Sequence, residues 1–98
     1  MDIKDKSYYG HTRPEMLPFI PKNAKRILEI GCGQANFSAQ LVQDGVEVWG
    51  VEPDKSAAKV ASTRLFKVLV GILDDTINDL PNNYFDVIIM NDVLEHLL

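Results

Sequence analysis

Hydrophobic and polar positions alternate along this chain of 98 residues in a pattern that predicts four strands separated by helices. The strands are expected over 26–30, 46–52, 67–71 and 85–90, where short runs of valine, isoleucine and leucine end at glycine, proline or polar residues. A regular succession of strand and helix is typical of a parallel sheet between helical layers. The pattern therefore predicts an α/β fold.

Between the predicted strands, apolar residues at helical spacing predict helices. Those in 34–44 share one face, so a helix is expected there, with Gly45 as its C-terminal cap. Asp54 is placed to cap a second helix that ends near residue 63. The apolar run within 85–90 is continuous, which predicts that the fourth strand is buried on both faces.

The first 25 residues are polar and are interrupted by Pro14, Pro18 and Pro21. Only a short helix, from Pro14 to about Phe19, is expected among them, because proline is tolerated in the first turn of a helix and not in its interior. The predicted organisation is thus a lead-in segment over 1–25 and a single domain over 26–98.

Composition narrows the class of protein. Ten basic residues stand against fourteen acidic ones, a formal net charge of −4, and the basic residues are scattered, so nucleic acid is not an expected partner. The single cysteine, Cys32, cannot form an internal disulfide, and no apolar run has the length of a membrane span or a signal-peptide core. We expect a cytoplasmic protein with no membrane partner.

The segment 26–37 reads as a strand, a tight turn and the start of a helix. Gly31 and Gly33 stand one residue apart, and glycine lets a chain reverse direction while its backbone passes close to a ligand. The unpaired N–H groups of a following helix would point to the same place. The turn is therefore predicted to bind a polar small molecule.

The spacing of this turn differs from that of phosphate-binding loops. Asn36 occupies the position of the third glycine of a dinucleotide fingerprint, and the lysine of a P-loop is absent from the turn. Glu29, at the end of the strand, places a carboxylate that would repel a phosphate and suit a cation.

Glu52 ends the second predicted strand directly before Pro53, a position that favours extended backbone. An acid at such a strand tip can accept hydrogen bonds from both hydroxyls of a ribose. This favours an adenosyl ligand without distinguishing a sulfonium cofactor from a nicotinamide one, and a solvated acid on a loop is the alternative.

The run from Glu29 to Ala35 resembles motif I of the class I S-adenosylmethionine-dependent methyltransferases, although that family usually has a third glycine where this chain has Ala35. The run from Asn91 to Leu97 resembles the segment after the fourth strand in bacterial small-molecule methyltransferases. The resemblance implies a Rossmann-like three-layer parallel sheet of order 3-2-1-4 with right-handed crossovers. It also implies S-adenosylmethionine as cofactor and a small molecule as methyl acceptor.

By this resemblance, the cofactor is held at the ends of the strands and in the turn. The implied residues are Glu29, Gly31, Cys32, Gly33, Ala35, Glu52, Pro53, Asp74 and Asn91. Asp74 corresponds to an acid that contacts the adenine amino group, with a solvated turn as the alternative. Asn91 corresponds to a residue at the methionine end of the cofactor.

Two further groups of residues, one near each end of the chain, each have more than one interpretation. The cluster of Tyr8, Tyr9, His11 and Arg13 either packs on the surface or folds over the cofactor site, as N-terminal segments of the family often do. His96 is the one candidate catalytic residue, as a hydrogen bonder or general base near the acceptor, and first-turn helix packing is the other interpretation. Asp92, Glu95 and His96 imitate a metal site of some relatives, but they suit Mg²⁺ or Zn²⁺ poorly, so no metal is expected.

The family fold has seven strands and this chain ends just after the fourth, so it resembles the N-terminal, cofactor-binding part of an enzyme. A non-catalytic module of the same fold and an NAD-dependent oxidoreductase remain alternatives. The unpaired edge of the fourth strand predicts a homodimer in which two such edges pair antiparallel, unless residues 1–20 fold back over it.

Overall fold

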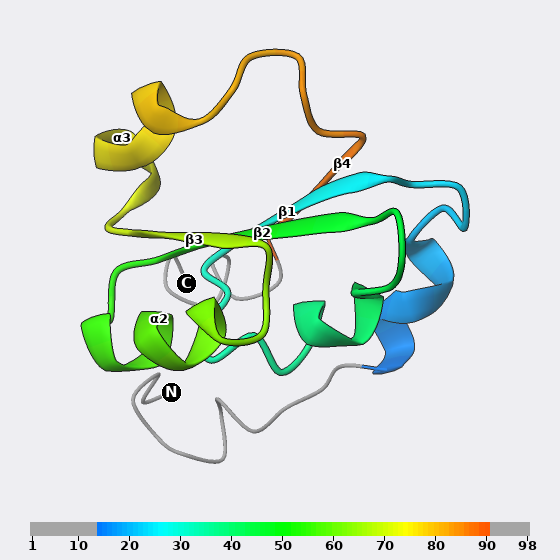
Figure 1. Ribbon diagram of the computed structural model, residues 1–98, viewed down its shortest axis with the longest axis horizontal. Helices are drawn as coiled ribbons and strands as arrows, with labels where there is room; N and C mark the ends of the chain where they lie inside the picture. The colour runs from blue at the N-terminus through cyan, green and yellow to red at the C-terminus, as the bar shows by residue number, and fades with distance from the viewer. Residues whose placement is uncertain (1–13, 91–98) are drawn as a thin grey trace.

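The structure, a computed structural model, describes residues 14–90 of the chain. Its centre is one sheet of four strands, β1 (Arg26–Ile30), β2 (Glu47–Glu52), β3 (Lys67–Val70) and β4 (Val87–Ile89). All neighbouring strands are parallel, and their order is β3-β2-β1-β4 (Figure 1). The predicted α/β class, strand positions and order 3-2-1-4 are confirmed.

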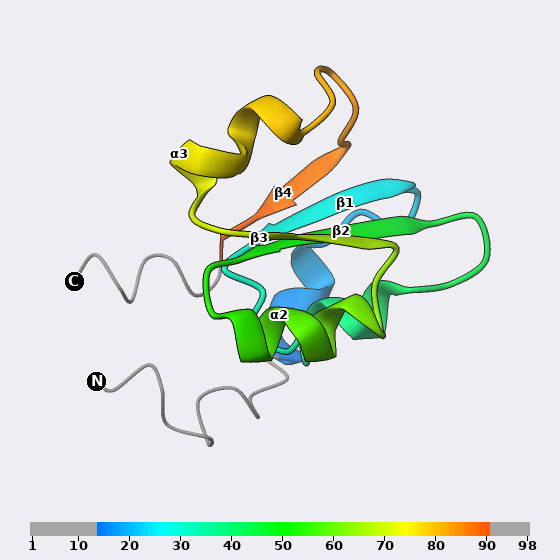
Figure 2. The same cartoon turned by 60° about the vertical axis from the view of Figure 1, so that its left-hand side comes forward.

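Helical segments cover both faces of the sheet, which makes three layers (Figures 1 and 2). One face carries α2 (Lys55–Ser62) together with two 3₁₀ helices, η1 (Pro14–Phe19) and η2 (Ser38–Leu41). The other face carries α3 (Leu73–Thr76) and the 3₁₀ helix η3 (Ile77–Asp79).

Successive residues of β1 serve the two faces in turn, as the two-residue period of a strand requires. Leu28 and Ile30 pack with Trp49 and Val51 in the core cluster that also includes Leu73 of α3. Ile27 belongs to the cluster on the opposite face. That cluster also includes Ala24, Phe37 and Ile89, with Met16, Leu17 and Ile20 packed against it. Part of the lead-in segment therefore contributes to the core.

Two of the predicted helices are confirmed. The helix from Pro14 to Phe19 is η1. The helix after Asp54 is α2, and the Asp54 carboxylate caps it by accepting the N–H groups of Ser56 and Ala57 at 2.9 and 3.2 Å. No helix within residues 14–90 has the length and apolar character needed to cross a membrane.

The prediction of a helix over 34–44 was wrong, because only η2 forms there. Ala35 has a φ of +69°, a left-handed conformation that a right-handed helix cannot contain. Gly45, predicted as a helix cap, instead lies in a tight turn that the Val46 N–H closes on the Gln43 carbonyl at 3.0 Å. Its φ of +82° is one that glycine adopts without strain.

The prediction that β4 is buried on both faces was also wrong. Ile89 is 5% exposed, whereas the neighbouring Ile88 is 59% exposed. Ile89 packs in the cluster below the sheet, and Ile88 lines an open cavity between the sheet and the segment that contains α3. A short α3 and η3 leave this part of the upper face uncovered within residues 14–90.

Candidate functional site

The turn after β1 folds over the end of β2. The N–H groups of Gly31 and Cys32 both donate to the Val51 carbonyl, at 2.7 and 3.2 Å. Gly31 and Gly33 have φ values of +74° and +58°, which glycine adopts at little cost. The two glycines predicted to shape this turn therefore do so by their left-handed backbone.

Glu52 ties this turn to the start of α2. Its side chain is 5% exposed, with Oε1 accepting the Gly33 N–H at 2.7 Å and Oε2 accepting the Asp54 N–H at 2.9 Å. A carboxylate offers about four lone-pair positions. These two hydrogen bonds use two of these positions.

A cavity of about 360 Å³ opens beside Glu52, at the carboxyl ends of β1, β2 and β3. In parallel α/β sheets this end of the strands is where ligands bind. The lining is mostly apolar, with two carboxylates, and comprises Ile30, Gly31, Val51, Glu52, Pro53, Gly71, Ile72, Leu73, Asp74 and Met90. Such a lining suits a flat apolar ring with polar groups on its edge.

Comparison with known proteins agrees with this geometry. The family described as "Methyltransferase domain" matches residues 1–98. The chain belongs to this family. An uncharacterized methyltransferase of Anoxybacillus flavithermus is 28% identical to this chain in an alignment of 103 positions that covers 95% of the chain and 49% of the relative.

Two solved structures are similar to this methyltransferase-family chain. A SAM-dependent methyltransferase from Archaeoglobus fulgidus is 27% identical with a TM-score of 0.70, over 86% of this chain and 38% of that one. The O-methyltransferase TomG from Streptomyces achromogenes, involved in tomaymycin synthesis and solved in complex with SAM, is 25% identical with a TM-score of 0.58, over 76% and 41%. The chain thus spans less than half the length of each of these proteins.

Four of the predicted site residues of the methyltransferase-family chain line the cavity. They are Gly31, Glu52, Pro53 and Asp74. Asp74 lies in the first turn of α3, where a solvated turn was the alternative, and its side chain is exposed. The structure therefore brings the turn after β1, the tip of β2 and the start of α3 to one place.

Other predicted residues lie behind the cavity. Glu29 is buried within β1. Cys32 and Ala35 belong to the core cluster beside α2, so their side chains pack away from solvent and their backbones form the turn. Asn91 and His96 lie outside the described residues, as do Asp92 and Glu95 of the metal alternative. Within residues 14–90, no three His, Cys, Asp or Glu side chains are grouped to hold a metal ion.

Sequence reasoning missed Ile72, Leu73 and Met90, which form much of the apolar wall. Gly71, with a φ of +144°, turns the chain at the end of β3. Ile72 follows it and is 52% exposed. An apolar residue directly after a glycine at a strand tip was the available signal, because such a residue has no strand neighbour to pack against.

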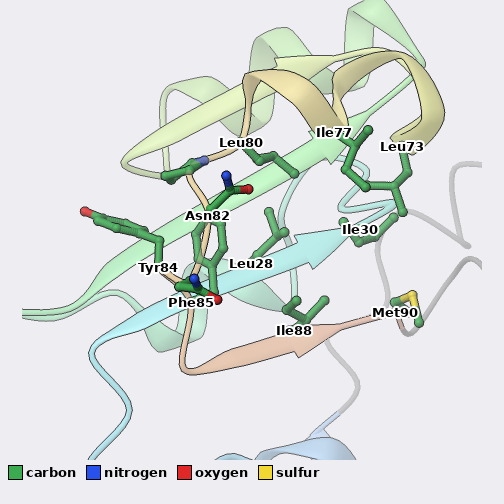
Figure 3. A pocket seen from close by; sticks show the side chains of 12 residues that line it. Leu28, Ile30, Leu73, Ile77, Leu80, Asn82, Tyr84, Phe85, Ile88 and Met90 are labelled. Carbon is green, nitrogen blue, oxygen red and sulfur yellow. The ribbon is translucent and has the colours of Figure 1, made fainter.

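A larger cavity of about 500 Å³ lies between the sheet and the segment 73–85 (Figure 3). It shares Ile30, Leu73 and Met90 with the smaller cavity, so the two adjoin. Tyr84 supplies the one titratable side chain of its lining, and the other side chains are apolar or amides. The smaller cavity, with the glycine turn and two carboxylates, is therefore the candidate functional site.

A polar cluster occupies the opposite end of the sheet. The Tyr84 hydroxyl donates to Glu47 Oε1, and the Trp49 Nε1–H donates to the same oxygen at 3.1 Å. The Arg26 guanidinium lies 4.2 Å from the centre of the Tyr84 ring. Hydrogen bonds from Tyr84 and Trp49 lower the pKa of Glu47, and the bond to Glu47 raises the pKa of Tyr84. Because Glu47 begins β2 and Glu52 ends it, this cluster stabilises the sheet away from the site.

Proposed function

We propose that this chain is the cofactor-binding part of an S-adenosylmethionine-dependent methyltransferase that acts on a small molecule. The observation that carries the proposal is the hydrogen bond from the Gly33 N–H to Glu52 at 2.7 Å. This N–H, at the centre of the glycine turn, is already bound to a carboxylate. It is therefore not offered to a phosphate.

The same turn lacks the other features of a pyrophosphate site. A dinucleotide fold binds pyrophosphate at the N-terminus of the helix that follows the turn. Here the next regular element is η2, which has four residues and begins at Ser38. Asn36 stands at the third glycine position. S-adenosylmethionine has no phosphate and carries a positive sulfonium, so buried carboxylates near the turn suit it better than they suit NAD.

The cavity fits the adenosine half of such a cofactor. The remaining lone pairs of Glu52 would accept hydrogen bonds from the ribose hydroxyls, and Asp74 would accept one from the adenine amino group. Ile72 and Leu73 supply the apolar walls for the adenine ring. Pro53 lines the cavity beside Glu52.

The turn serves the methionine half. The backbone of Gly31, Cys32, Gly33 and Ala35 lets that half approach the end of β1, with Glu29 buried in the strand behind it. Asn91 is the expected contact at the methionine end.

The chemistry is methyl transfer. S-adenosylmethionine, when bound, supplies a methyl group on a sulfonium, which an acceptor oxygen, nitrogen or carbon attacks in line while the carbon–sulfur bond breaks with its electron pair going to sulfur. The residues of this chain contribute by holding and orienting, and positioning of this kind accounts for a large share of such catalysis. His96 is the candidate for accepting a proton from the acceptor.

The chain spans less than half the length of each of the compared proteins, so the proposal concerns only part of such an enzyme. Residues 26–98 form part of the cofactor-binding domain, after the lead-in segment 1–25. The net charge of −4 and the scattered basic residues favour a small-molecule acceptor over nucleic acid. We place the protein in the cytoplasm.

Calorimetric titration of the chain with S-adenosylmethionine, S-adenosylhomocysteine and NAD tests the cofactor. We expect the chain to bind S-adenosylmethionine and S-adenosylhomocysteine and not to bind NAD. Tighter binding of NAD would favour an oxidoreductase, and binding of none would favour a non-catalytic module. The acceptor is tested by transfer of a labelled methyl group from S-adenosylmethionine to the components of a cell extract. Labelling is expected to survive treatment of the extract with ribonuclease, and loss of labelling would indicate an RNA acceptor.

A further inference from the structure

Arg64, which follows the C-terminal end of α2, reaches the glycine turn with its side chain. Its Nη1 donates to the Gln34 carbonyl at 3.2 Å and to Asn36 Oδ1 at 2.7 Å. The two acceptors are the immediate neighbours of Ala35. One guanidinium nitrogen therefore holds both sides of a single residue that lies about thirty positions earlier in the sequence.

Ala35 is the residue of this turn that needs holding. Its φ of +69° is a left-handed conformation, which costs an alanine about 1–2 kcal/mol and a glycine almost nothing. Ala35 is 0% exposed, and its N–H donates to the Cys32 carbonyl at 2.9 Å. The strained residue thus connects directly to the part of the turn that lies between Gly31 and Gly33.

Arg64 is well placed to resist that strain. It follows α2, and its own N–H donates to the Ala61 carbonyl at 2.9 Å. The next residue, Leu65, is buried in the same core cluster as Ala35. The backbone at Arg64 is therefore anchored in the core, and the guanidinium extends from a rigid base.

We propose that Arg64 is a positioning residue that holds residues 34–36 so that Ala35 keeps its left-handed conformation and the glycine turn is formed before the cofactor arrives. This proposal rests on the proposed function. Alanine at position 35 disfavours the left-handed conformation that the site requires. The two hydrogen bonds from the charged Arg64 side chain offset this conformational cost. With glycine at position 35, the same two bonds matter less.

The test compares Arg64→Met, which keeps the aliphatic stem and removes the donors, with Lys59→Met, which removes one positive charge from α2. Each substitution is made in the full chain, once with Ala35 and once with Ala35→Gly. Amide exchange of residues 33–36 is measured without ligand, and the thermal midpoint is measured alongside. S-adenosylhomocysteine affinity is measured by calorimetry.

With Ala35 present, Arg64→Met is expected to speed amide exchange in the turn and weaken S-adenosylhomocysteine binding by about fivefold each, the scale of a charged but solvent-accessible hydrogen bond. Lys59→Met is expected to change neither. In the Ala35→Gly background the effect of Arg64→Met is expected to fall below about twofold, because glycine needs no restraint there.

Equal effects of Arg64→Met in the two backgrounds would overturn the proposal. Amide exchange in the turn of Arg64→Met that is no faster than in Lys59→Met would also overturn it. So would an Arg64→Met variant in which exchange is faster evenly over the whole sheet and the thermal midpoint is lowered. The exchange measurement needs no ligand. Failure of the unsubstituted chain to bind S-adenosylhomocysteine would therefore count against the proposed function and leave the test of Arg64 intact.

Discussion

Glu52 and Gly33 are joined by a buried hydrogen bond of 2.7 Å between a carboxylate at the tip of β2 and a backbone N–H in the turn after β1. Parallel pairing makes this bond possible, because Ile30 and Val51 are register partners and bring the two strand ends together. The same carboxylate accepts the N–H of Asp54, the cap of α2. One side chain therefore links the turn, a strand tip and a helix start around the candidate site.

The first prediction concerns that carboxylate. Glu52→Gln is expected to weaken S-adenosylhomocysteine binding by about 1.5–3 kcal/mol, roughly 10- to 150-fold, because it replaces a charged acceptor of hydrogen bonds with a neutral one. Calorimetry measures the change. Glu47→Gln is the matched control, since Glu47 begins the same strand at its other end, and it is expected to leave the affinity unchanged. Equal affinity of Glu52→Gln and the unsubstituted chain would remove Glu52 from the site.

The second prediction concerns the packing beneath the turn. A Cβ added at Gly50 would lie 2.6 Å from Cys32 Sγ and 3.1 Å from Leu65 Cδ1. Gly50→Ala is therefore expected to lower the free energy of unfolding by about 1–3 kcal/mol, the usual cost of overpacking a core. Denaturant unfolding measures the loss. In a Cys32→Ala background the cost is expected to be smaller, because the sulfur that the new methyl group would strike is gone, and an undiminished cost would contradict this account.

The third prediction is a pH dependence at Asp86. Its Oδ2 accepts the N–H groups of Lys25 at 2.8 Å and of Arg26 at 3.0 Å, and these bonds lower the pKa of the Asp86 carboxyl below its ordinary value of 3.8. A lowered folded-state pKa means that the stabilisation is present above pH 3.8 and is lost as the pH falls through the folded-state value.

Asp86→Asn is accordingly expected to be less stable than the unsubstituted chain at neutral pH, with the gap closing as the medium is acidified below the ordinary carboxyl pKa. Urea unfolding over a pH series measures the gap. Asp44→Asn, at an exposed position in the turn before β2, is the control and is expected to show no gap. A gap at Asp86 that does not vary with pH would contradict the role of the charge.

The fourth prediction concerns association. Within residues 14–90, β4 pairs with β1 on one side and has no strand on its other side. An apolar strand edge that is exposed tends to pair with another chain, so two copies are expected to join their β4 edges antiparallel. Ile88→Lys is expected to disrupt this dimer, because Ile88 is exposed, whereas Ile89 is buried and its substitution would damage the core.

Light scattering after size exclusion, over a range of concentrations, measures the dimer. Val70→Lys is the matched control, because Val70 is a half-exposed residue on β3, the opposite edge of the sheet. Because Met16, Leu17 and Ile20 of the predicted covering segment 1–20 pack against the core, deletion of residues 1–13 tests whether the rest of that segment covers the β4 edge instead. A monomer at every concentration, with and without that deletion, would contradict both forms of the prediction.

Local patterns in the sequence were enough to predict the frame of this protein. Apolar runs ending at glycine, proline or a polar residue located the four strands, and Asp54 located the start of α2. The paired glycines located the turn at Gly31 and Gly33. These features depend on the period of the backbone and on residues with special φ preferences, both of which are properties of neighbouring residues in the chain.

Only the tertiary structure decided how these parts meet. Alanine is a good helix former, yet Ala35 takes a left-handed conformation in the core, so the helix expected over 34–44 does not form. Ile88 is as apolar as its neighbours, yet it is exposed because the segment above it is short. Glu52 was an acid at a strand tip in the sequence, and its bond to Gly33 exists because parallel pairing aligns two strand ends. Each of these outcomes depends on contacts between residues far apart in the chain, which no local pattern encodes.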